Sequence, residues 1–178
     1  MGARMTEMRQ LFLLRHAKSS WDDNVPDDFD RPLNGRGRRN AQALATHLAH
    51  GHVRPALVLC SAAKRTSETY DILEPALEGV PVAFESDLYE ATKHDLVIRL
   101  RRLDDHLSSV LVVGHNPGLE RLAAALCAGH GEKAPLAMLA EKYPTGTLAV
   151  LETDIEHWAA LEDGCCRLAQ FVRPADLG

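Results

Sequence analysis

Arg15 and His16 are the residues whose types and position most clearly predict chemistry. They follow the apolar run 11–14, which predicts a short buried strand. In open α/β sheets, ligands bind at the carboxyl ends of the strands. A guanidinium at such an end can hold a phosphoryl group through two parallel hydrogen bonds. A histidine there can act as a base or a nucleophile near neutral pH.

Two further apolar runs end in residues of the same kind. Residues 56–60 are followed by Ser61 and Arg65, and residues 110–113 are followed by Gly114 and His115. Because the carboxyl ends of neighbouring parallel strands converge on one crevice, these side chains are expected to meet Arg15 and His16. A lone histidine is more often a structural residue, but two at matching strand ends beside arginines favour a site for a phosphoryl group.

Strands alternate with helices along the chain. Asn34 is a predicted helix N-cap, and the predicted helices cover 36–50, 66–77, 93–107, a stretch from 117 or 119 to 128, and a short helix within 131–143. Further strands are predicted at 80–84, 147–152, 158–161 and 165–172. This alternation predicts an α/β fold with three layers, in which helices flank a mainly parallel central sheet. The closely spaced C-terminal strands indicate that one or two of them are antiparallel.

Length and composition limit the kinds of protein and partner. A chain of 178 residues fits one domain, which we expect at 9–178 after a loose tail at 1–8. The net charge of −5 argues against a nucleic-acid partner. No signal peptide and no bilayer-spanning apolar stretch is evident, so no membrane partner is expected. Four cysteines without a C-x-x-C pair predict reduced thiols and a cytoplasmic location.

Three motifs resemble those of the histidine phosphatase superfamily, which also contains the cofactor-dependent phosphoglycerate mutases. They are residues 13–17 (Leu-Leu-Arg-His-Ala), 61–66 (Ser-Ala-Ala-Lys-Arg-Thr) and 113–118 (Val-Gly-His-Asn-Pro-Gly). The stretches 15–23 and 28–34 are similar to its short SixA-like branch, the phosphohistidine phosphatases. The resemblance covers 11–151 and implies a phosphoglycerate mutase-like fold. Ala17 stands where a glycine is most common in the family, and the small side chain leaves the chemistry intact.

The resemblance implies a role for each matching residue. His16 would be the nucleophile that carries a phosphohistidine intermediate, and Arg15, Arg65 and His115 would clamp the phosphoryl oxygens. The chemistry agrees, because nearby guanidinium groups keep an imidazole neutral and also stabilise the charge on the phosphoryl group. We expect no metal and no other cofactor, since these cations supply the positive potential.

Three other candidates carry two interpretations each. Glu90 lies where many relatives keep a general acid, which would protonate a leaving alkoxide, but it could equally be a solvated residue before a helix. Lys18 and Ser19 are candidate phosphate contacts or members of a solvated loop. The acidic loop, with Asp22, Asp23, Asp27, Asp28 and Asp30, is predicted to be solvated. In the alternative interpretation, Asp22 or Asp23 helps to shape the mouth of the pocket.

We expect the substrate to be a phosphorylated protein or a small phosphate ester. Arg65, Glu90 and His115 are spaced 25 positions apart, which leaves little chain for a lid. An open pocket suits a phosphohistidine side chain of a protein and disfavours a mutase, which must shield its phosphoenzyme from water. The alternatives are a phosphomonoesterase for sugar or nucleotide phosphates, and a non-catalytic phosphoryl-binding module.

Overall fold

A computed structural model describes residues 7–22, 24–51 and 53–177 of the chain. Of the tail expected at 1–8, residues 1–6 lie outside the described residues, and Glu7 and Met8 are exposed ahead of the first strand. The strands are β1 (Arg9–Arg15), β2 (Leu57–Ser61), β3 (Val82–Glu85), β4 (Ser109–Gly114), β5 (Leu148–Thr153) and β6 (Cys166–Val172). The α-helices are α1 (Gly35–His50), α2 (Lys64–Leu73), α3 (Lys93–Arg101), α4 (Gly118–Cys127) and α5 (Lys133–Glu141).

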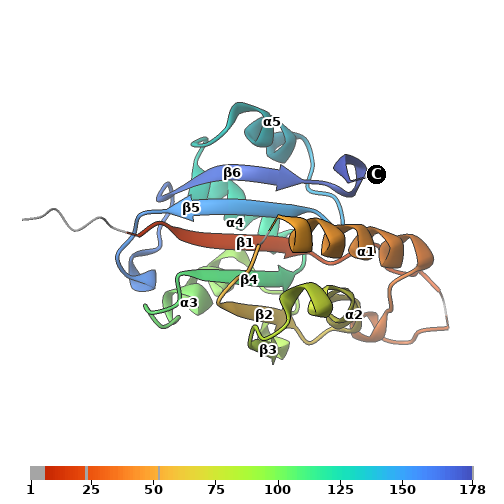
Figure 1. Ribbon diagram of the computed structural model, residues 1–178. Coiled ribbons are helices and arrows are strands. Elements are labelled where there is room, and N and C mark those ends of the chain that lie inside the picture. The colour runs from red at the N-terminus through yellow and green to blue at the C-terminus, as the bar shows by residue number, and fades with distance from the viewer. Residues whose placement is uncertain (1–6, 23, 52, 178) are drawn as a thin grey trace, which may run out of the picture.

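The strands form one sheet in the order β3-β2-β4-β1-β5-β6 (Figure 1). The pairs β1–β4, β2–β4 and β2–β3 are parallel, whereas β5 runs antiparallel to both β1 and β6. The prediction of a mainly parallel sheet with antiparallel C-terminal strands is therefore confirmed. Because β1, β2 and β4 are parallel, their carboxyl ends lie at the same edge of the sheet.

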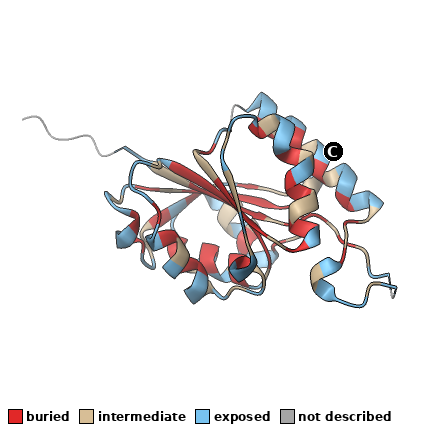
Figure 2. Cartoon of the chain, turned by 90° about the horizontal axis from the view of Figure 1, so that it is seen from below, coloured by how far each residue is buried: buried red, intermediate tan, exposed pale blue. Residues whose placement is uncertain are grey.

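Helices cover both faces of this sheet. Along β1, Leu11 and Leu13 pack into the core formed with α3 and α4, while Phe12 and Leu14 pack into the core formed with α1 and α2. Figure 2 shows the buried residues concentrated on the strands and on the helix faces that meet them. The three-layer prediction is confirmed. Successive side chains of β1 point to opposite faces of the sheet, and both faces are apolar because helices cover both of them.

Helix α1 begins where the sequence predicts. Asn34 is its N-cap, and the side-chain oxygen of Asn34 accepts a hydrogen bond from the Gly37 N–H at 2.8 Å. The start of α1 also packs on the segment that follows β1, because the Asn34 N–H donates to the Lys18 carbonyl at 3.0 Å. The helix therefore supports the backbone that leads out of the predicted site.

Three predicted elements differ from the structure. The helix predicted at 66–77 is an α-helix only to Leu73 and continues as a 3-10 helix over Glu74–Leu77. The strand predicted at 158–161 is wrong: Trp158–Ala160 is a 3-10 helix, and its buried indole donates to the Leu107 carbonyl at 2.9 Å. The Trp158 side chain packs into the core, but the backbone of this 3-10 helix pairs with no strand of the sheet. Helix α3 ends at Arg101 rather than at 107, because tight turns carry Arg102 and Leu103 out of the helical path.

The ends of β1, β2 and β4 lie side by side. Arg15 is in register with Gly114, and Cys60 is in register with Val113. The His16 N–H continues the ladder by donating to the Gly114 carbonyl at 3.0 Å. The three predicted strand ends therefore meet at one edge of the sheet, as the sequence indicates.

The four cysteines are free thiols in the structure. None of the helices in the described part of the chain has the length and hydropathy that crossing a bilayer requires.

Candidate active site

His16 is buried at the end of β1, and one backbone carbonyl sets its tautomer. Its Nδ1 lies 2.7 Å from the Ala17 carbonyl oxygen. Because a carbonyl only accepts hydrogen bonds, Nδ1 carries the proton and the lone pair of the neutral ring lies on Nε2. Burial, together with smaller effects of His115, Arg65 and Arg15, lowers the pKa of His16 to about 3. The ring is therefore neutral at physiological pH and has a nucleophilic nitrogen.

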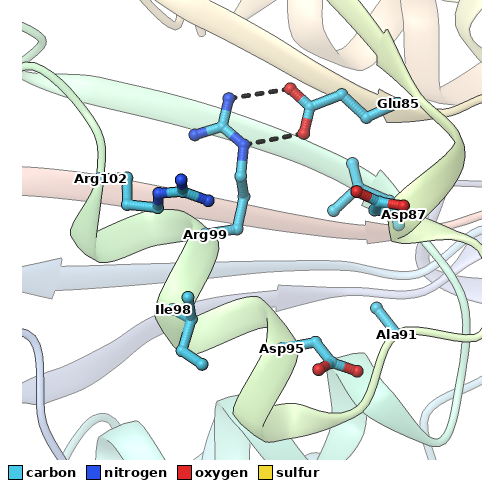
Figure 3. A pocket seen from close by; sticks show the side chains of 8 residues that line it. Glu85, Asp87, Ala91, Asp95, Ile98, Arg99 and Arg102 are labelled. Carbon is cyan, nitrogen blue, oxygen red and sulfur yellow. Dashed lines mark hydrogen bonds and ion pairs between the residues drawn. The ribbon is translucent and has the colours of Figure 1, made fainter.

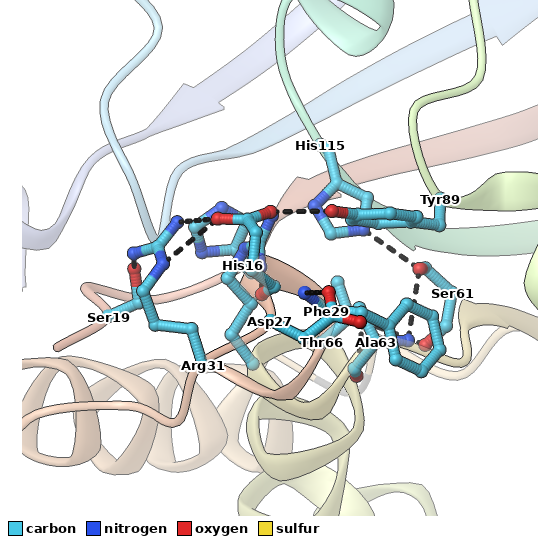
Figure 4. A network of polar contacts seen from close by, with 12 residues as sticks. His16, Ser19, Asp27, Phe29, Arg31, Ser61, Ala63, Thr66, Tyr89 and His115 are labelled. Carbon is cyan, nitrogen blue, oxygen red and sulfur yellow. Dashed lines mark hydrogen bonds and ion pairs between the residues drawn. The ribbon is translucent and has the colours of Figure 1, made fainter. Parts of the chain in front are cut away.

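His115 lies beside His16, with 5.4 Å between the ring centroids. Its Nε2 is 2.8 Å from the Ser61 hydroxyl at the end of β2 (Figure 4). Burial and the positive charge of Arg65 lower the pKa of His115 to about 4. When the Ser61 hydroxyl donates to Nε2, the neutral ring keeps its proton on Nδ1 and can donate that proton to an oxyanion.

The two predicted arginines are held by backbone carbonyls. Arg15 donates from Nη1 to the Tyr143 carbonyl, and Arg65 donates from Nη1 to the Asp28 carbonyl, both at 2.8 Å. The Nε atoms of both arginines are buried and have no hydrogen-bond partner among the described residues, and the same holds for Nδ1 of His115. Unpaired buried donors are costly, and a phosphoryl group would supply acceptors for these.

The structure adds three residues to which the sequence analysis gave no role in the site. The Asp28 carboxylate accepts hydrogen bonds from Tyr89 Oη at 2.6 Å, from Arg65 Nη2 at 3.0 Å and from Arg31 Nε at 3.1 Å. The hydrogen bond from Tyr89 lowers the pKa of Asp28 to about 2, and Arg65 and Arg31 act in the same direction. Asp28 is exposed, as expected for a residue of a solvated loop, but its carboxylate also contacts Arg65, which the sequence analysis did not predict.

One sequence signal could have pointed to this contact. Asp28 precedes Arg31 by three residues, and both lie in the stretch that resembles the SixA-like branch. Of the two carboxylates expected at the pocket mouth, Asp22 accepts a hydrogen bond from the Asn24 N–H and does not line the cavity described below, and Asp23 lies outside the described residues.

Lys18 and Ser19 lie beside the site in different ways. The buried Ser19 hydroxyl accepts a hydrogen bond from Arg31, so it supports that guanidinium. Lys18 is half-buried, and its carbonyl accepts the Asn34 N–H. Its side chain is not part of the lining of the cavity described next.

A cavity of about 410 Å³ lies in front of His115. We call it the site cavity. Its lining residues are Asp28, Arg31, Arg65, Tyr89, Glu90, Ala91, Thr92, Lys93, His115, Asn116, Pro117, Gly118 and Arg121. Glu90, Thr92 and Arg121 are exposed, so the cavity opens to solvent at its rim.

Glu90 reaches this rim from a strained turn. Its φ of 58° lies in the left-handed region, which costs a residue with a side chain about 1 kcal/mol or more. The turn also packs tightly on α4, since a Cβ on Gly118 would lie 2.3 Å from the Ala91 carbonyl oxygen. The structure thus places Glu90 at the cavity, but as an exposed carboxylate.

A second hollow, of about 370 Å³, is lined by residues from the end of β3, the segment after it and helix α3 (Figure 3). Glu85 and Arg99 form a two-hydrogen-bond ion pair in it, at 2.7 and 2.8 Å. None of the residues proposed for chemistry lines this hollow. Of the predicted site residues, Arg65, Glu90 and His115 line the site cavity. His16 is not among the lining residues but lies behind them, with its ring 5.4 Å from that of His115.

Comparison with known proteins agrees with this geometry. The family model of the histidine phosphatase superfamily (branch 1) matches residues 11–96. An uncharacterized protein of Mycobacterium tuberculosis is 37% identical over 167 residues, which cover 90% of this chain and 99% of that protein.

Solved structures agree as well. A candidate phosphohistidine phosphatase, SixA, from Agrobacterium tumefaciens is 30% identical with a TM-score of 0.79, over 93% of this chain and 98% of that one. A second candidate SixA, from Nakamurella multipartitia, is 29% identical with a TM-score of 0.78, over 94% and 96%. With Arg15, His16, Arg65 and His115 gathered at the ends of parallel strands in this phosphoglycerate mutase-like fold, the chain belongs to the histidine phosphatase superfamily and is a phosphatase.

Proposed function

We propose that the protein is a metal-independent phosphatase that forms a phosphohistidine intermediate on His16 and acts on phosphohistidine in proteins. The observation that carries the proposal is a neutral His16, with its lone pair on Nε2, beside three buried unpaired donors of Arg15, Arg65 and His115. Such a set supplies a nucleophile and an oxyanion clamp without a metal ion.

The first step is the transfer of the phosphoryl group to His16. Nε2 of His16 attacks phosphorus and the bond from phosphorus to the leaving nitrogen breaks. The electron pair stays on the substrate ring, which leaves as neutral imidazole because its other nitrogen carries a proton. Arg15, Arg65 and His115 donate hydrogen bonds to the phosphoryl oxygens, which carry the charge of the transition state. In the second step, water attacks phosphorus, inorganic phosphate leaves, and His16 returns to its neutral form.

Two observations support a protein substrate. The chain from Arg65 to His115 forms α2, β3, α3 and β4 of the layered fold, so it adds no cap over the site. A phosphohistidine leaving group is an imidazole, which needs less help from a general acid than an alkoxide does, and this fits an exposed Glu90. The SixA names of two similar structures point to the same substrate.

We also propose that residues 9–178 form a single catalytic domain and that the protein works in the cytoplasm. The strands of one sheet, with a core on each face, run from Arg9 to Val172. The four free thiols suit a reducing compartment.

The first prediction concerns the nucleophile. His16→Ala should lower turnover of an aryl phosphate and of a phosphohistidine protein by about three orders of magnitude, because the covalent route is lost. Rapid quench with radiolabelled substrate should trap an acid-labile phosphoenzyme in the wild type and none in the variant.

Two controls accompany this test. His94→Ala removes an exposed histidine and should leave turnover unchanged. Treatment with a chelator should also have no effect. Loss of activity with chelator would overturn the metal-independent mechanism, and a phosphoenzyme that persists in His16→Ala would overturn the assignment of the nucleophile.

Glu90 separates this function from the alternative, a small-molecule phosphomonoesterase, which its place at the site cavity favours. We expect Glu90→Gln to change turnover of the phosphohistidine protein by less than about threefold. Wild-type kcat/KM should also be higher for that protein than for alkyl phosphates. A preference for alkyl phosphates that Glu90→Gln abolishes would instead establish the phosphomonoesterase.

A further inference from the structure

The Asp28 carboxylate makes the contacts that a phosphoryl group would make. Its two oxygens accept hydrogen bonds from Arg65, from Arg31 and from the Tyr89 hydroxyl. Arg65 lies beside His16 and His115, whose pKa values its charge lowers. An anion of this chain is therefore bound to one of the cations that would clamp the substrate.

The ion pair between Asp28 and Arg65 can break without displacing the arginine. The Asp28 side chain is 48% exposed, whereas that of Arg65 is 7% exposed. The arginine is also held by the Asp28 backbone carbonyl, which does not depend on the carboxylate. The carboxylate can thus turn into solvent while the guanidinium stays in place.

The loop that carries Asp28 is closed at its base. Ser19 and Leu33 form a bridge, and the Ser20 N–H donates to the Pro32 carbonyl at 2.8 Å. A swing of the Asp28 side chain therefore needs no change in the path of the chain on either side of the loop.

The negative charge of Asp28 offsets part of the positive charge of the arginines at the site. Three guanidinium groups, those of Arg15, Arg31 and Arg65, lie at or next to the site, and each can hold an oxyanion strongly. A phosphatase with three uncompensated guanidiniums would hold its product, inorganic phosphate, as well as its substrate. A carboxylate that returns to Arg65 offsets part of that attraction.

We propose that Asp28 is a specificity-determining residue, an internal anion that a phosphoryl group displaces from Arg65 and that returns to expel inorganic phosphate. This rests on the proposed use of Arg65 as a phosphate ligand. Its consequence is that the site accepts only oxyanions that bind strongly enough to displace the carboxylate.

The test is the affinity for inorganic phosphate, measured by isothermal titration calorimetry at neutral pH. Asp28→Asn keeps the shape of the side chain and removes its charge, and it should bind phosphate about tenfold more tightly than the wild type. Asp28→Ala, which adds no new donor, should also bind it more tightly. In steady-state assays, inorganic phosphate should inhibit both variants at lower concentration.

Asp30→Asn is the matched control, because it removes the same charge from an exposed side chain in the same helical turn. It should leave phosphate affinity within about twofold of the wild type. Equal or weaker binding by Asp28→Asn would show that the carboxylate positions the arginines and would overturn the proposal. Tighter binding by Asp28→Asn alone would trace the gain to the new amide donor and would overturn it as well.

This result is independent of the catalytic mechanism. If no phosphoenzyme forms on His16, the phosphate titration still decides the role of Asp28. If the phosphoenzyme forms while phosphate affinity is unchanged in the Asp28 variants, only the displacement by phosphate is overturned.

Discussion

At the residue scale, the chemistry depends on which nitrogen of His16 carries the proton. The Ala17 carbonyl binds the Nδ1 proton, and burial keeps the ring neutral. A single backbone contact therefore leaves the lone pair on Nε2, the nitrogen that attacks phosphorus in the proposed mechanism. In that mechanism the neighbouring cations serve two purposes, since they disfavour the imidazolium and attract the phosphoryl group.

Nuclear magnetic resonance of the imidazole nitrogens can test this arrangement. We expect His16 to show the Nδ1–H tautomer and to remain neutral from neutral pH down to about pH 4, because its pKa is lowered to about 3. The reference is the histidine signal of the urea-unfolded chain, which should titrate near the ordinary value of 6.5. An Nε2–H tautomer, or protonation of His16 close to 6.5, would contradict the assignment.

At the element scale, the first turn of α1 holds the segment that follows the nucleophile. A Cβ on Gly37 would lie 2.0 Å from the Lys18 carbonyl oxygen and 2.9 Å from the Lys18 nitrogen. The helix therefore touches the backbone two residues after His16, and only glycine permits that approach. The predicted N-cap Asn34 and the close contact at Gly37 thus position the segment that leads out of the site.

Gly37→Ala should destabilise the protein by roughly 2–4 kcal/mol and lower kcat, because the added methyl group must push a backbone apart. Gly35→Ala is the matched control in the same turn. There the new Cβ would meet only the flexible end of the Arg39 side chain at 3.3 Å, and alanine favours the helix. Urea unfolding of both variants provides the measurement. Equal stability of the two would rule out the close contact with Lys18.

At the scale of the whole molecule, the fold keeps two uncharged histidines inside a cationic site. The folded pKa values are about 3 for His16 and about 4 for His115, against 6.5 for an ordinary histidine. Below pH 6.5 the unfolded chain binds protons that the folded chain does not bind. These two residues therefore lower the free energy of unfolding as the pH falls from 6.5 towards 4.

The expected slope from the pair is at most about 2.7 kcal/mol per pH unit, the value for two protons. Urea unfolding at a series of pH values between 7 and about 4 would measure it. His115→Asn should flatten the curve in this range, because one of the two groups is removed. A stability that rises on acidification would show that the histidines gain protons on folding.

The sequence by itself determined the layered fold and the residues at the ends of β1, β2 and β4. Local patterns are sufficient for this, because apolar runs, caps and turn residues depend on neighbours in the chain. Arg15, His16, Arg65 and His115 could be predicted as one group, since parallel strands end at a common edge. Family resemblance added their roles, which remain proposals here.

The tertiary structure alone decided the contacts between segments that are distant in sequence. Asp28 meets Arg65 and Tyr89 across 37 and 61 positions, and its spacing from Arg31, the one local signal, does not indicate these distant partners. The sequence around Trp158 predicts a strand, but Trp158 is instead held by hydrogen bonds to Asp105 and Leu107, which are distant in the sequence. The charge state of His16 also depends on burial and on charges from other strands, which exist only in the folded chain.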